Sequence, residues 1–539
     1  MAPRSPRGAL VARILALGAA LILAGVAAAA SPSAAFRQAV AEAAAGDRDI
    51  AAFYQAADYQ PIWTGTGRED RARREALLRA VSEADDHGLP EGRYDADDIA
   101  AAIRAARSES DLGRLEVDLS RAFLRYARDV QTGFITPASV DPDIVREVPL
   151  RDRRQLLLAF AASTPDAFLR ALPPKSQEYT RLMKAKFQLE RTLGQGGWGP
   201  TVEVRDTLRP GDQGPGVIAL RNRLIAMGYL GRTATTAFDA RMQSAVAAFQ
   251  SDHGLTADGV AGPSTIAELN VPVETRLGQV MVAMERERWM NTPEGRGKTH
   301  IWVNLPDFHM QLVDDGKVTF QTRAVVGENR LDKHTPEFSD MMTYMEVNPD
   351  WTVPRSILAR DYLPKFQANP NAARYLQLID SSGRQVSREA IDFSRYTARN
   401  FPFTVRQAPG DANALGRVKF MFPNPHAIYL HDTPAKELFS REVRAYSSGC
   451  IRLNDPFDFA YELLSRQMAN PKPYFDGILA TGRQTRVDLE TPIPVHLVYR
   501  TAFTDAKGRV QYRRDFYGRD AMIWDAMRAA GVALRAVRS

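Results

Sequence analysis

Hydrophobic residues recur every three or four positions in the first third of the chain and every second position in the last part. Between residues 36 and 190, stretches such as REALLRAVSEADDHGL and LEVDLSRAFLRYARDVQTGFI predict helices. Beyond His300, the alternation in HIWVNLPDFHMQLVDDGKVTFQTRAVVG predicts strands. We therefore predict a multidomain α+β protein, with a helical scaffold before a β-rich domain.

A glycine-punctuated unit between these regions predicts a small three-helix domain. The linker-like stretch GQGGWGP precedes it, Asp239 is a candidate N-cap, and Gly254 follows the second helix. We interpret His253 as a capping or packing residue, because no second nitrogen or sulfur ligand stands at a metal-binding spacing. The predicted helices are Pro215 to Met227, Asp239 to His253 and Gly262 to Leu269.

The β-rich part contains two predicted hairpin turns and one interruption. Residues 314–316 and 505–508 have turn sequences between strand-like runs. Residues 355–395 instead predict helix and loop, and an insertion of this kind is a candidate lid over an active site. Residues 277–291 predict one more amphipathic helix, which joins the modules.

The N-terminus predicts a secretory signal peptide. Basic residues precede an uncharged apolar run from Ile14 to Val26, and the small residues Ala28 to Ala30 offer a cleavage site before Ser31. An uncleaved membrane anchor is the alternative, but the run is shorter than the roughly 20 residues that span a bilayer. We expect a mature chain that is soluble and periplasmic.

Charge gives no indication of nucleic-acid binding. The chain has 70 Lys and Arg against 64 Asp and Glu. Removal of Arg4, Arg7 and Arg13 with the signal peptide would reduce the net charge of +6 to +3. Such a small excess over so long a chain argues against a nucleic-acid partner.

Cys450, in AYSSGCIRLND, is the only cysteine of the 539 residues. In an exported protein a lone cysteine has no intrachain partner, so it is either a buried small hydrophobe or a working thiol. A working thiol needs a base or a positive field to become the nucleophilic thiolate. His431, nineteen residues earlier at the end of an apolar strand, is a candidate proton shuttle because imidazole titrates near neutrality.

The neighbours of Cys450 extend this hypothesis. Gly449 allows close approach of the backbone to a substrate carbonyl, and N–H groups in such a turn can form an oxyanion hole. Ser447 and Ser448 offer hydroxyls or carbonyls that could orient the histidine. Arg452 could favour the thiolate or hold a substrate carboxylate. Each residue is common by itself, and an isolated histidine or arginine in such a place is more often structural.

The combination of HDTP with SSGCIRL closely resembles the catalytic pattern of the L,D-transpeptidases with a YkuD-type domain. That pattern is a His-Gly-Thr-like triplet followed by Ser-x-Gly-Cys-x-Arg. Asp432 replaces the usual glycine, as in the YLHDTP of large Gram-negative members. The three-helix unit resembles a peptidoglycan-binding domain, through GDQG, LRNRL, GYL, AVAAFQSDHGL and DGVAGPST. The matching catalytic positions are His431, Ser447, Gly449, Cys450 and Arg452, with Ser448 at the variable position.

This resemblance implies a domain plan that covers nearly the whole mature chain. The catalytic domain would contain the lid as an insertion at about 355–416. The implied domains are a signal peptide (1–30), a helical scaffold (31–195), a peptidoglycan-binding domain (205–271), a connecting helix (272–298), the catalytic domain (299–504), and a C-terminal hairpin and helix (505–539).

The resemblance also implies a reaction. Cys450 would attack a tetrapeptide stem, release D-alanine and form a thioester that a second stem's amine resolves. Trp351 and Tyr429 could line the substrate channel, although core packing explains them equally well. No metal or organic cofactor is implied. The implied partners are peptidoglycan, other cell-wall synthesis proteins and carbapenem-type inhibitors.

Two other functions remain open at this stage. A carboxypeptidase or endopeptidase would use the same thioester with water as the acceptor. A non-catalytic wall-binding scaffold would keep Cys450 inert. A papain- or caspase-type protease is disfavoured, because neither local cysteine motif occurs.

Overall fold

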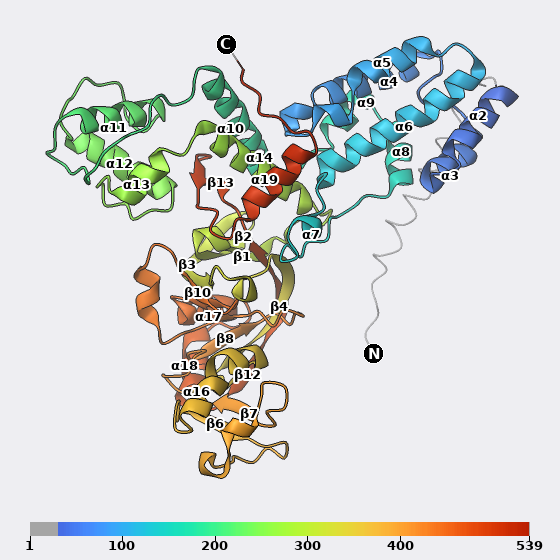
Figure 1. Ribbon diagram of the computed structural model, residues 1–539. Coiled ribbons are helices and arrows are strands. Elements are labelled where there is room, and N and C mark those ends of the chain that lie inside the picture. The colour runs from blue at the N-terminus through green and yellow to red at the C-terminus, as the bar shows by residue number, and fades with distance from the viewer. Residues whose placement is uncertain (1–30, 538–539) are drawn as a thin grey trace. The chain divides into compact units, whose positions relative to one another are not determined.

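The computed structural model describes residues 31–537, so the predicted signal peptide at residues 1–30 lies outside the described residues. The described chain divides into two compact units (Figure 1). The first comprises Tyr94–Ala127, Arg151–Ala171 and the residues up to Ser82. The second comprises Glu83–Arg93, Arg128–Leu150 and the chain from Leu172 onward. We describe each unit by itself.

The first unit is helical, as the 3- and 4-residue spacing predicts. Its core contains Trp63, which is stacked on Phe160 at 5.1 Å between ring centroids. The buried Glu116 carboxylate accepts the N–H groups of Ile62 and Thr64 at 2.7 and 2.8 Å, so it fixes the loop before α4. Its helices are α2 (Ala34–Ala44), α3 (Arg48–Ala56), α4 (Arg68–Ser82), α5 (Ala96–Ala105), α8 (Arg153–Ala161), α9 (Pro165–Arg170) and α6 (Glu109–Thr132) as far as Ala127.

The small helical domain of the second unit agrees closely with the predicted helices. The Asp239 side chain caps the second helix by accepting the N–H of Met242, and Gly254 follows that helix with φ of +68°. His253 is buried and stacks on Phe249 at 3.8 Å, which confirms a packing role. The helices are α11 (Pro215–Ala226), α12 (Ala240–Asp252) and α13 (Pro263–Leu269).

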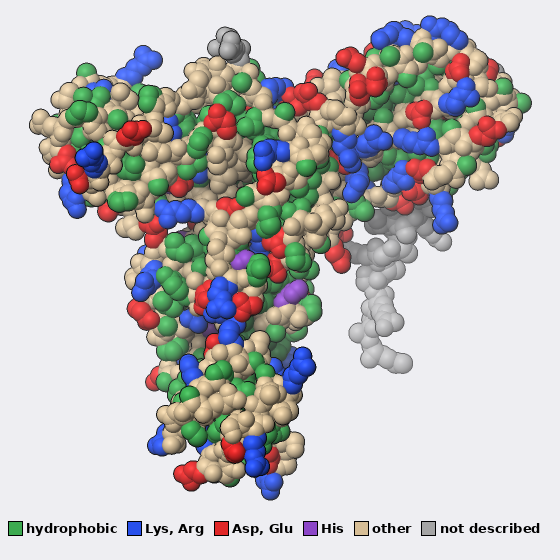
Figure 2. All heavy atoms as spheres, in the orientation of Figure 1, with side chains coloured by type: hydrophobic (Ala, Val, Ile, Leu, Met, Phe, Trp, Pro, Cys, Tyr) green, Lys and Arg blue, Asp and Glu red, His purple; other side chains and the backbone are tan. Residues whose placement is uncertain are grey.

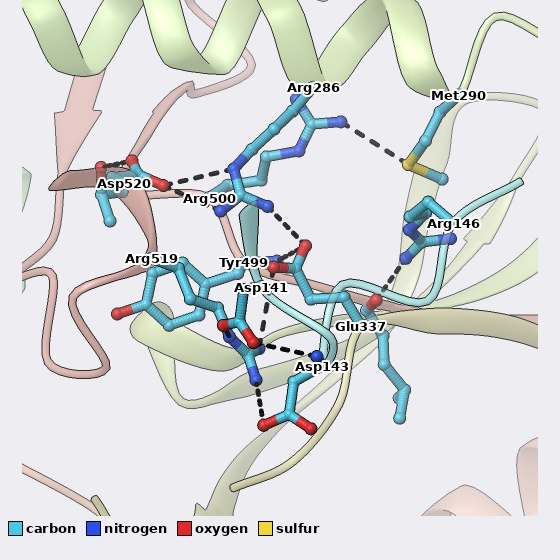
Figure 3. A network of polar contacts seen from close by, with 12 residues as sticks. Asp141, Asp143, Arg146, Arg286, Met290, Glu337, Tyr499, Arg500, Arg519 and Asp520 are labelled. Atoms are coloured by element: carbon cyan, nitrogen blue, oxygen red, sulfur yellow. Dashed lines mark hydrogen bonds and ion pairs between the residues drawn. The ribbon is translucent and has the colours of Figure 1, made fainter. Parts of the chain in front are cut away.

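The connecting helix α14 (Val273–Trp289) is not amphipathic, contrary to the prediction. Nearly all of its side chains are buried, including Arg286 and Arg288. Ion pairs with buried carboxylates make this possible: Arg286 binds Glu337 at 2.5 Å and Asp520 at 3.0 Å (Figure 3). Helix α10 (Gln177–Gly194) packs along α14.

A second set of ion pairs adjoins these contacts. Arg519, fully buried, donates to Asp141 at 3.1 Å and to Asp143 at 3.3 Å (Figure 3). We call Arg286, Glu337, Asp520, Arg519 and Asp141 the α14 ion-pair network. It connects α14 with the 141–143 segment, with Glu337 directly before the strand that begins at Phe338, and with the C-terminal helix.

The β-rich domain is built on one sheet whose ends meet. Its strands are β1 (Thr299–Asn304), β2 (His309–Asp314), β3 (Lys317–Gly327), β4 (Phe338–Val347), β8 (Val418–Met421), β9 (Leu430–His431), β10 (Ala445–Ser447), β11 (Ile451–Leu453) and β12 (Thr485–Val498). The order is β10-β3-β11-β9-β8-β4-β12-β1-β2, and β2 also pairs with β3, which closes the sheet. The predicted turn at 314–316 joins β2 to β3. Helices α17 (Pro456–Leu464) and α18 (Pro471–Ala480) follow β11.

The candidate lid is an insertion with its own sheet and core. The prediction of helix and loop is incomplete, because three short strands in the order β5-β7-β6 form part of it. These strands have two to four residues, too few for an alternating pattern to be visible. Its core extends from Trp351 to Leu415. Its elements are β5 (Trp351–Thr352), α15 (Arg355–Ile357), a π-helical turn (Leu358–Tyr362), α16 (Leu363–Ala368), β6 (Leu376–Ile379) and β7 (Thr404–Gln407).

The C-terminal region begins with the predicted hairpin, β13 (Ala502–Thr504) and β14 (Val510–Tyr512), followed by α19 (Arg519–Ala529). The face visible in Figure 2 carries interspersed basic and acidic side chains. Over residues 31–537, no helix has the length and apolarity that crossing a membrane requires. The remaining helix, α7 (Pro137–Val140), precedes the 141–143 segment.

Candidate active site

Strand pairing brings the cysteine and histidine motifs together. Cys450 directly precedes β11, which runs parallel to β9 with Arg452 opposite His431. The N–H of Ile451 donates to the carbonyl of Tyr429 at 3.1 Å. Because residues two apart on a strand face the same side, Cys450, Arg452 and His431 share one face of the sheet.

The turn before the thiol is held by the Ser447 hydroxyl. It donates to the carbonyl of Cys450 at 2.6 Å and accepts the N–H of Gly449 at 3.1 Å. Gly449 has φ of +117°, which side chains rarely allow, and a Cβ there would lie 3.2 Å from Ile428. This geometry accounts for glycine at that position and fixes the direction of the Cys450 backbone.

The structure contradicts the expectation that the two serines orient the histidine. Ser447 is engaged within the turn, and the Ser448 hydroxyl accepts a hydrogen bond from Arg360 of the lid at 3.2 Å. The Nδ1 atom of His431 instead donates to the carbonyl of Asp432. Nδ1 must therefore carry the proton, which leaves the Nε2 lone pair of the neutral ring to accept one.

The resting site favours a neutral thiol and a neutral imidazole. Burial raises the pKa of Cys450 to about 11, although hydrogen bonds from Tyr429 and the charge of Arg452 act in the opposite direction. Burial, with a smaller effect of Arg452, lowers the pKa of His431 to about 3. The thiol donates to the carbonyl of Ala427 at 3.6 Å. Arg452 therefore favours the thiolate, as expected, but burial has the larger effect.

Arg452 makes no direct ion pair with a described residue, although Glu328 and Glu437 attract its charge from a longer distance. No carboxylate among residues 31–537 lies within 4 Å of its guanidinium group, and its buried Nε has no hydrogen-bond partner. Burial lowers its pKa, yet the group stays protonated at neutral pH. Its position beside Cys450 suits it to bind a substrate carboxylate.

The two aromatic candidates have different surroundings. Trp351 is buried in the core of the lid, where its ring lies 6.1 Å from that of Tyr362, so core packing explains it. Tyr429 contacts both the lid core and the sheet core, and its ring lies 5.7 Å from His431. Only Tyr429 thus adjoins the thiol and the histidine.

Thr335 is a positioning residue that the sequence did not indicate. Its buried hydroxyl donates to the carbonyl of Gly449 at 2.7 Å and accepts the N–H of Gly327 at 3.0 Å. Its carbonyl accepts from Arg519 at 3.1 Å, and its N–H donates to the Tyr517 hydroxyl at 3.2 Å. The C-terminal segment thereby supports the turn that carries the thiol.

Asp432 also has a structural role that was not predicted. Its carboxylate accepts the N–H of Arg417 at 2.9 Å and the Lys436 ammonium at 2.8 Å. A Cβ on Gly416 would lie 2.3 Å from this carboxylate. Asp432 therefore fixes the end of the lid against the histidine strand. No three His, Cys, Asp or Glu side chains in residues 31–537 are grouped as a metal site would require.

Family models match three parts of the chain. Residues 298–504 match the L,D-transpeptidase catalytic domain, YkuD. Residues 213–269 match a model described as "Putative peptidoglycan binding domain", and residues 48–185 match a scaffold domain. Residues 298–504 therefore form an L,D-transpeptidase catalytic domain of the YkuD family, in a chain that also has a peptidoglycan-binding-type domain and a scaffold domain.

A curated relative and two solved structures are also similar to the chain. A "Putative L,D-transpeptidase" of Haemophilus influenzae is 34% identical over 236 residues, which are 42% of this chain and 47% of the relative. The match thus spans about half of that relative's length. L,D-transpeptidase structures from Xylanimonas cellulosilytica and Stackebrandtia nassauensis are 16% and 14% identical and cover 56% of this chain. They are themselves covered to 100% and 97%, with TM-scores of 0.17 and 0.21, too low to support an argument about the fold.

Proposed function

We propose that the protein is a periplasmic L,D-transpeptidase that cross-links peptidoglycan stem peptides through a thioester on Cys450. The observation that carries the proposal is the pairing of β9 with β11, which puts His431 and Cys450 on one face inside a domain of this family. The unpaired charge of Arg452 beside them supports a substrate with carboxylates.

In the first step, Cys450 attacks the carbonyl of the L-centre residue of a tetrapeptide stem. His431 Nε2 takes the thiol proton as the C–S bond forms, and then gives it to the amine of the departing D-alanine. The N–H of Cys450 has no intramolecular acceptor among residues 31–537 and is the candidate donor to the oxyanion. The Gly449 N–H is less suitable, because it donates to Ser447.

In the second step, the amine of an acceptor stem attacks the thioester carbonyl. The C–N bond forms, the C–S bond breaks, and His431 returns a proton from the amine to the sulfur. The resting pair holds its proton on sulfur, so the transfer of this proton to His431 would accompany the attack of Cys450 on the bound substrate.

Location and partners follow from the same proposal. The signal-peptide-like sequence of residues 1–30 supports export, and the three-helix domain supports retention on peptidoglycan. Hydrolysis of the same thioester by water is the second candidate. The lid favours transfer, because its contact with Ser448 would help to exclude water from the turn.

Intact-protein mass spectrometry tests the proposal. The mature enzyme and its Cys450→Ala variant are incubated with a purified disaccharide-tetrapeptide, and the products are identified by mass. We expect an acyl adduct on the wild type alone, release of D-alanine and a cross-linked dimer. A tripeptide product in place of the dimer would establish hydrolysis. A protein that forms neither adduct nor product would contradict catalysis, as would activity that survives in Cys450→Ala.

A further inference from the structure

A cavity of about 350 Å³ lies beside the first residues of β4 and has no part in the reaction described above. Trp289 and Phe338 form apolar walls, and Arg146, Asp340 and His426 contribute polar groups. The loop at 292–296 and residues 145–147, outside the domain matched to the family, complete it. A mixed lining of this kind is typical of small-ligand sites.

Arg146 brings into this cavity a guanidinium that makes no ion pair within 4 Å with any described residue. Glu337 attracts it from further away, whereas Arg500, Arg286 and Arg296 act in the opposite direction. The Arg146 guanidinium donates to the Ser339 hydroxyl and the carbonyl of Leu497, both neutral, and no carboxylate among residues 31–537 lies within 4 Å. Burial lowers its pKa to about 10, so it remains charged at neutral pH. Arg296, on the same cavity, is matched by Glu287 at 2.6 Å. Of the two arginines that line the cavity, Arg146 is thus the one that has no ion pair with a carboxylate.

None of the groups that line the cavity forms an ion pair with Arg146, and these groups limit the class of ligand. The pKa of His496 is lowered to about 3 by burial, and its two ring nitrogens bind Ser339 and the carbonyl of Arg296. Glu147 and Asp340 add carboxylates to the lining at more than 4 Å from the guanidinium. A guanidinium and carboxylates in one cavity disfavour a phosphate and suit an amino acid, with both carboxylate and amine.

One loop contributes both to the cavity and to the surroundings of the reacting thiol. His426 lines it, and the next residue, Ala427, accepts the hydrogen bond of Cys450 at 3.6 Å. Strand β4 begins at the cavity with Phe338, and the lid begins four residues after the strand ends, at Trp351. The cavity and the lid therefore lie at opposite ends of β4, with the loop that contacts the thiol along this strand.

We propose that this cavity binds the acceptor of the transfer, with the carboxylate of an amine-bearing amino acid on Arg146 and its amine directed toward Cys450. The proposal rests on the transpeptidase function and assigns its second substrate a site. The donor stem then occupies the lid side, next to Tyr429 and Arg452. The amino acid is either the free end of a diamino acid in a second stem or a free D-amino acid.

The test separates the two half-reactions with the full mature chain. Thioester formation from the disaccharide-tetrapeptide is measured first, by intact mass, for the wild type, Arg146→Gln and Arg146→Lys. Arg486→Gln is the matched control, because Arg486 is an exposed arginine on β12, outside the cavity. Transfer is then measured to a tripeptide stem, to D-methionine and to D-methioninamide, which lacks the carboxylate.

We expect the wild type to prefer D-methionine over its amide by ten- to hundredfold, as loss of a charge-assisted hydrogen bond would give. Arg146→Gln should form the thioester at the normal rate but lose this preference, with KM for the affected acceptor raised by a similar factor. Arg146→Lys should retain part of the preference. A loss confined to the tripeptide stem or to D-methionine identifies which of the two occupies the cavity.

Failure of the two proposals is distinguishable. If the wild type forms no thioester, the proposed function fails before any acceptor is added. The cavity proposal is overturned if the thioester forms, the wild type does not distinguish D-methionine from its amide, and Arg146→Gln leaves the KM for the tripeptide stem unchanged. Thioester formation at the normal rate shows that Arg146→Gln is folded. Equal acceptor KM values for Arg146→Gln, Arg486→Gln and the wild type would also overturn the cavity proposal.

Discussion

Around α14, the buried Arg286 and Arg519 have carboxylates on two sides, whereas Arg452 beside the thiol has none within 4 Å. The protein thus buries the same type of side chain under opposite conditions. In the α14 ion-pair network each buried arginine is paired with carboxylates of the protein, so no ligand is required to balance its charge. At the catalytic site Arg452 has no direct ion pair with a described residue, and burial outweighs the local charges, so that the thiol and imidazole are shifted toward their neutral forms.

Ion pairing distinguishes the buried charges that stabilise the fold from those that can bind a substrate. Buried ion pairs fix the contacts between segments. Removal of one charged partner leaves the other charge buried away from water and without a counter-charge. A buried charge without an ion pair costs free energy until a substrate provides the opposite charge. Substitutions in the two regions should therefore have separable effects, on stability in one case and on chemistry in the other.

The largest effect should come from Arg286→Met, which leaves Glu337 and Asp520 buried without their shared partner. We expect the free energy of unfolding to fall by about 3–5 kcal/mol. Urea unfolding followed by circular dichroism measures it. Thioester formation by the fraction that remains folded should be unchanged, which would separate the network from the chemistry.

An exposed arginine on α19 provides the control. Arg528 pairs with Asp525 three residues earlier, with 59% of its side chain exposed, so Arg528→Met should change stability by less than about 0.5 kcal/mol. If the two substitutions lowered the free energy of unfolding equally, burial of the α14 charges would not determine how much they contribute to stability. If folded Arg286→Met no longer formed the thioester, the α14 ion-pair network would be needed for the chemistry as well as for stability.

Thr335→Val tests the link between the regions. Valine has the shape of threonine but removes the hydroxyl, so the Gly449 carbonyl and the Gly327 N–H lose their partner. We expect about 1–3 kcal/mol of lost stability and at least a tenfold slower thioester formation in the folded protein. Stopped reactions analysed by intact mass measure the rate.

Thr335→Ser keeps the hydroxyl and should recover most of the rate, which a purely packing role would not predict. A Thr335→Val protein that is destabilised but acylates at the wild-type rate would restrict Thr335 to stability. In that outcome the turn at Gly449 would be held by Ser447 alone.

Short local patterns explain what could be predicted from the sequence. The helices around Asp239 and Gly254 were predicted to within one residue, because caps and glycines act on their own neighbours. Cys450 and His431 could be paired because both lie in short motifs. Their assigned roles remain predictions, which the experiments above address.

Long-range contacts explain what could not be predicted. Thr335 contacts Gly449 across 114 residues and Arg519 across 184, and no local pattern marks such a contact. The helix α14 was misjudged because periodicity records polar residues but not the carboxylates that allow them to be buried. The prediction that Ser447 orients the histidine was wrong for a related reason, since the Ser447 hydroxyl donates to the Cys450 carbonyl within its own turn.

The pH dependence of the thiol involves no loss of stability, and it tests directly whether burial outweighs the charge of Arg452. Because burial raises the pKa of Cys450 to about 11, alkylation by iodoacetamide should accelerate about tenfold per pH unit from pH 7 to 10 in the folded protein. In urea the rate should level off near pH 8.5, the ordinary value for a thiol. Arg452→Gln should slow alkylation further at pH 8, because it removes a charge that lowers the thiol pKa, whereas Arg486→Gln should not. A folded thiol that is already ionised at pH 7 would mean that its burial is compensated, as it is for the arginines around α14.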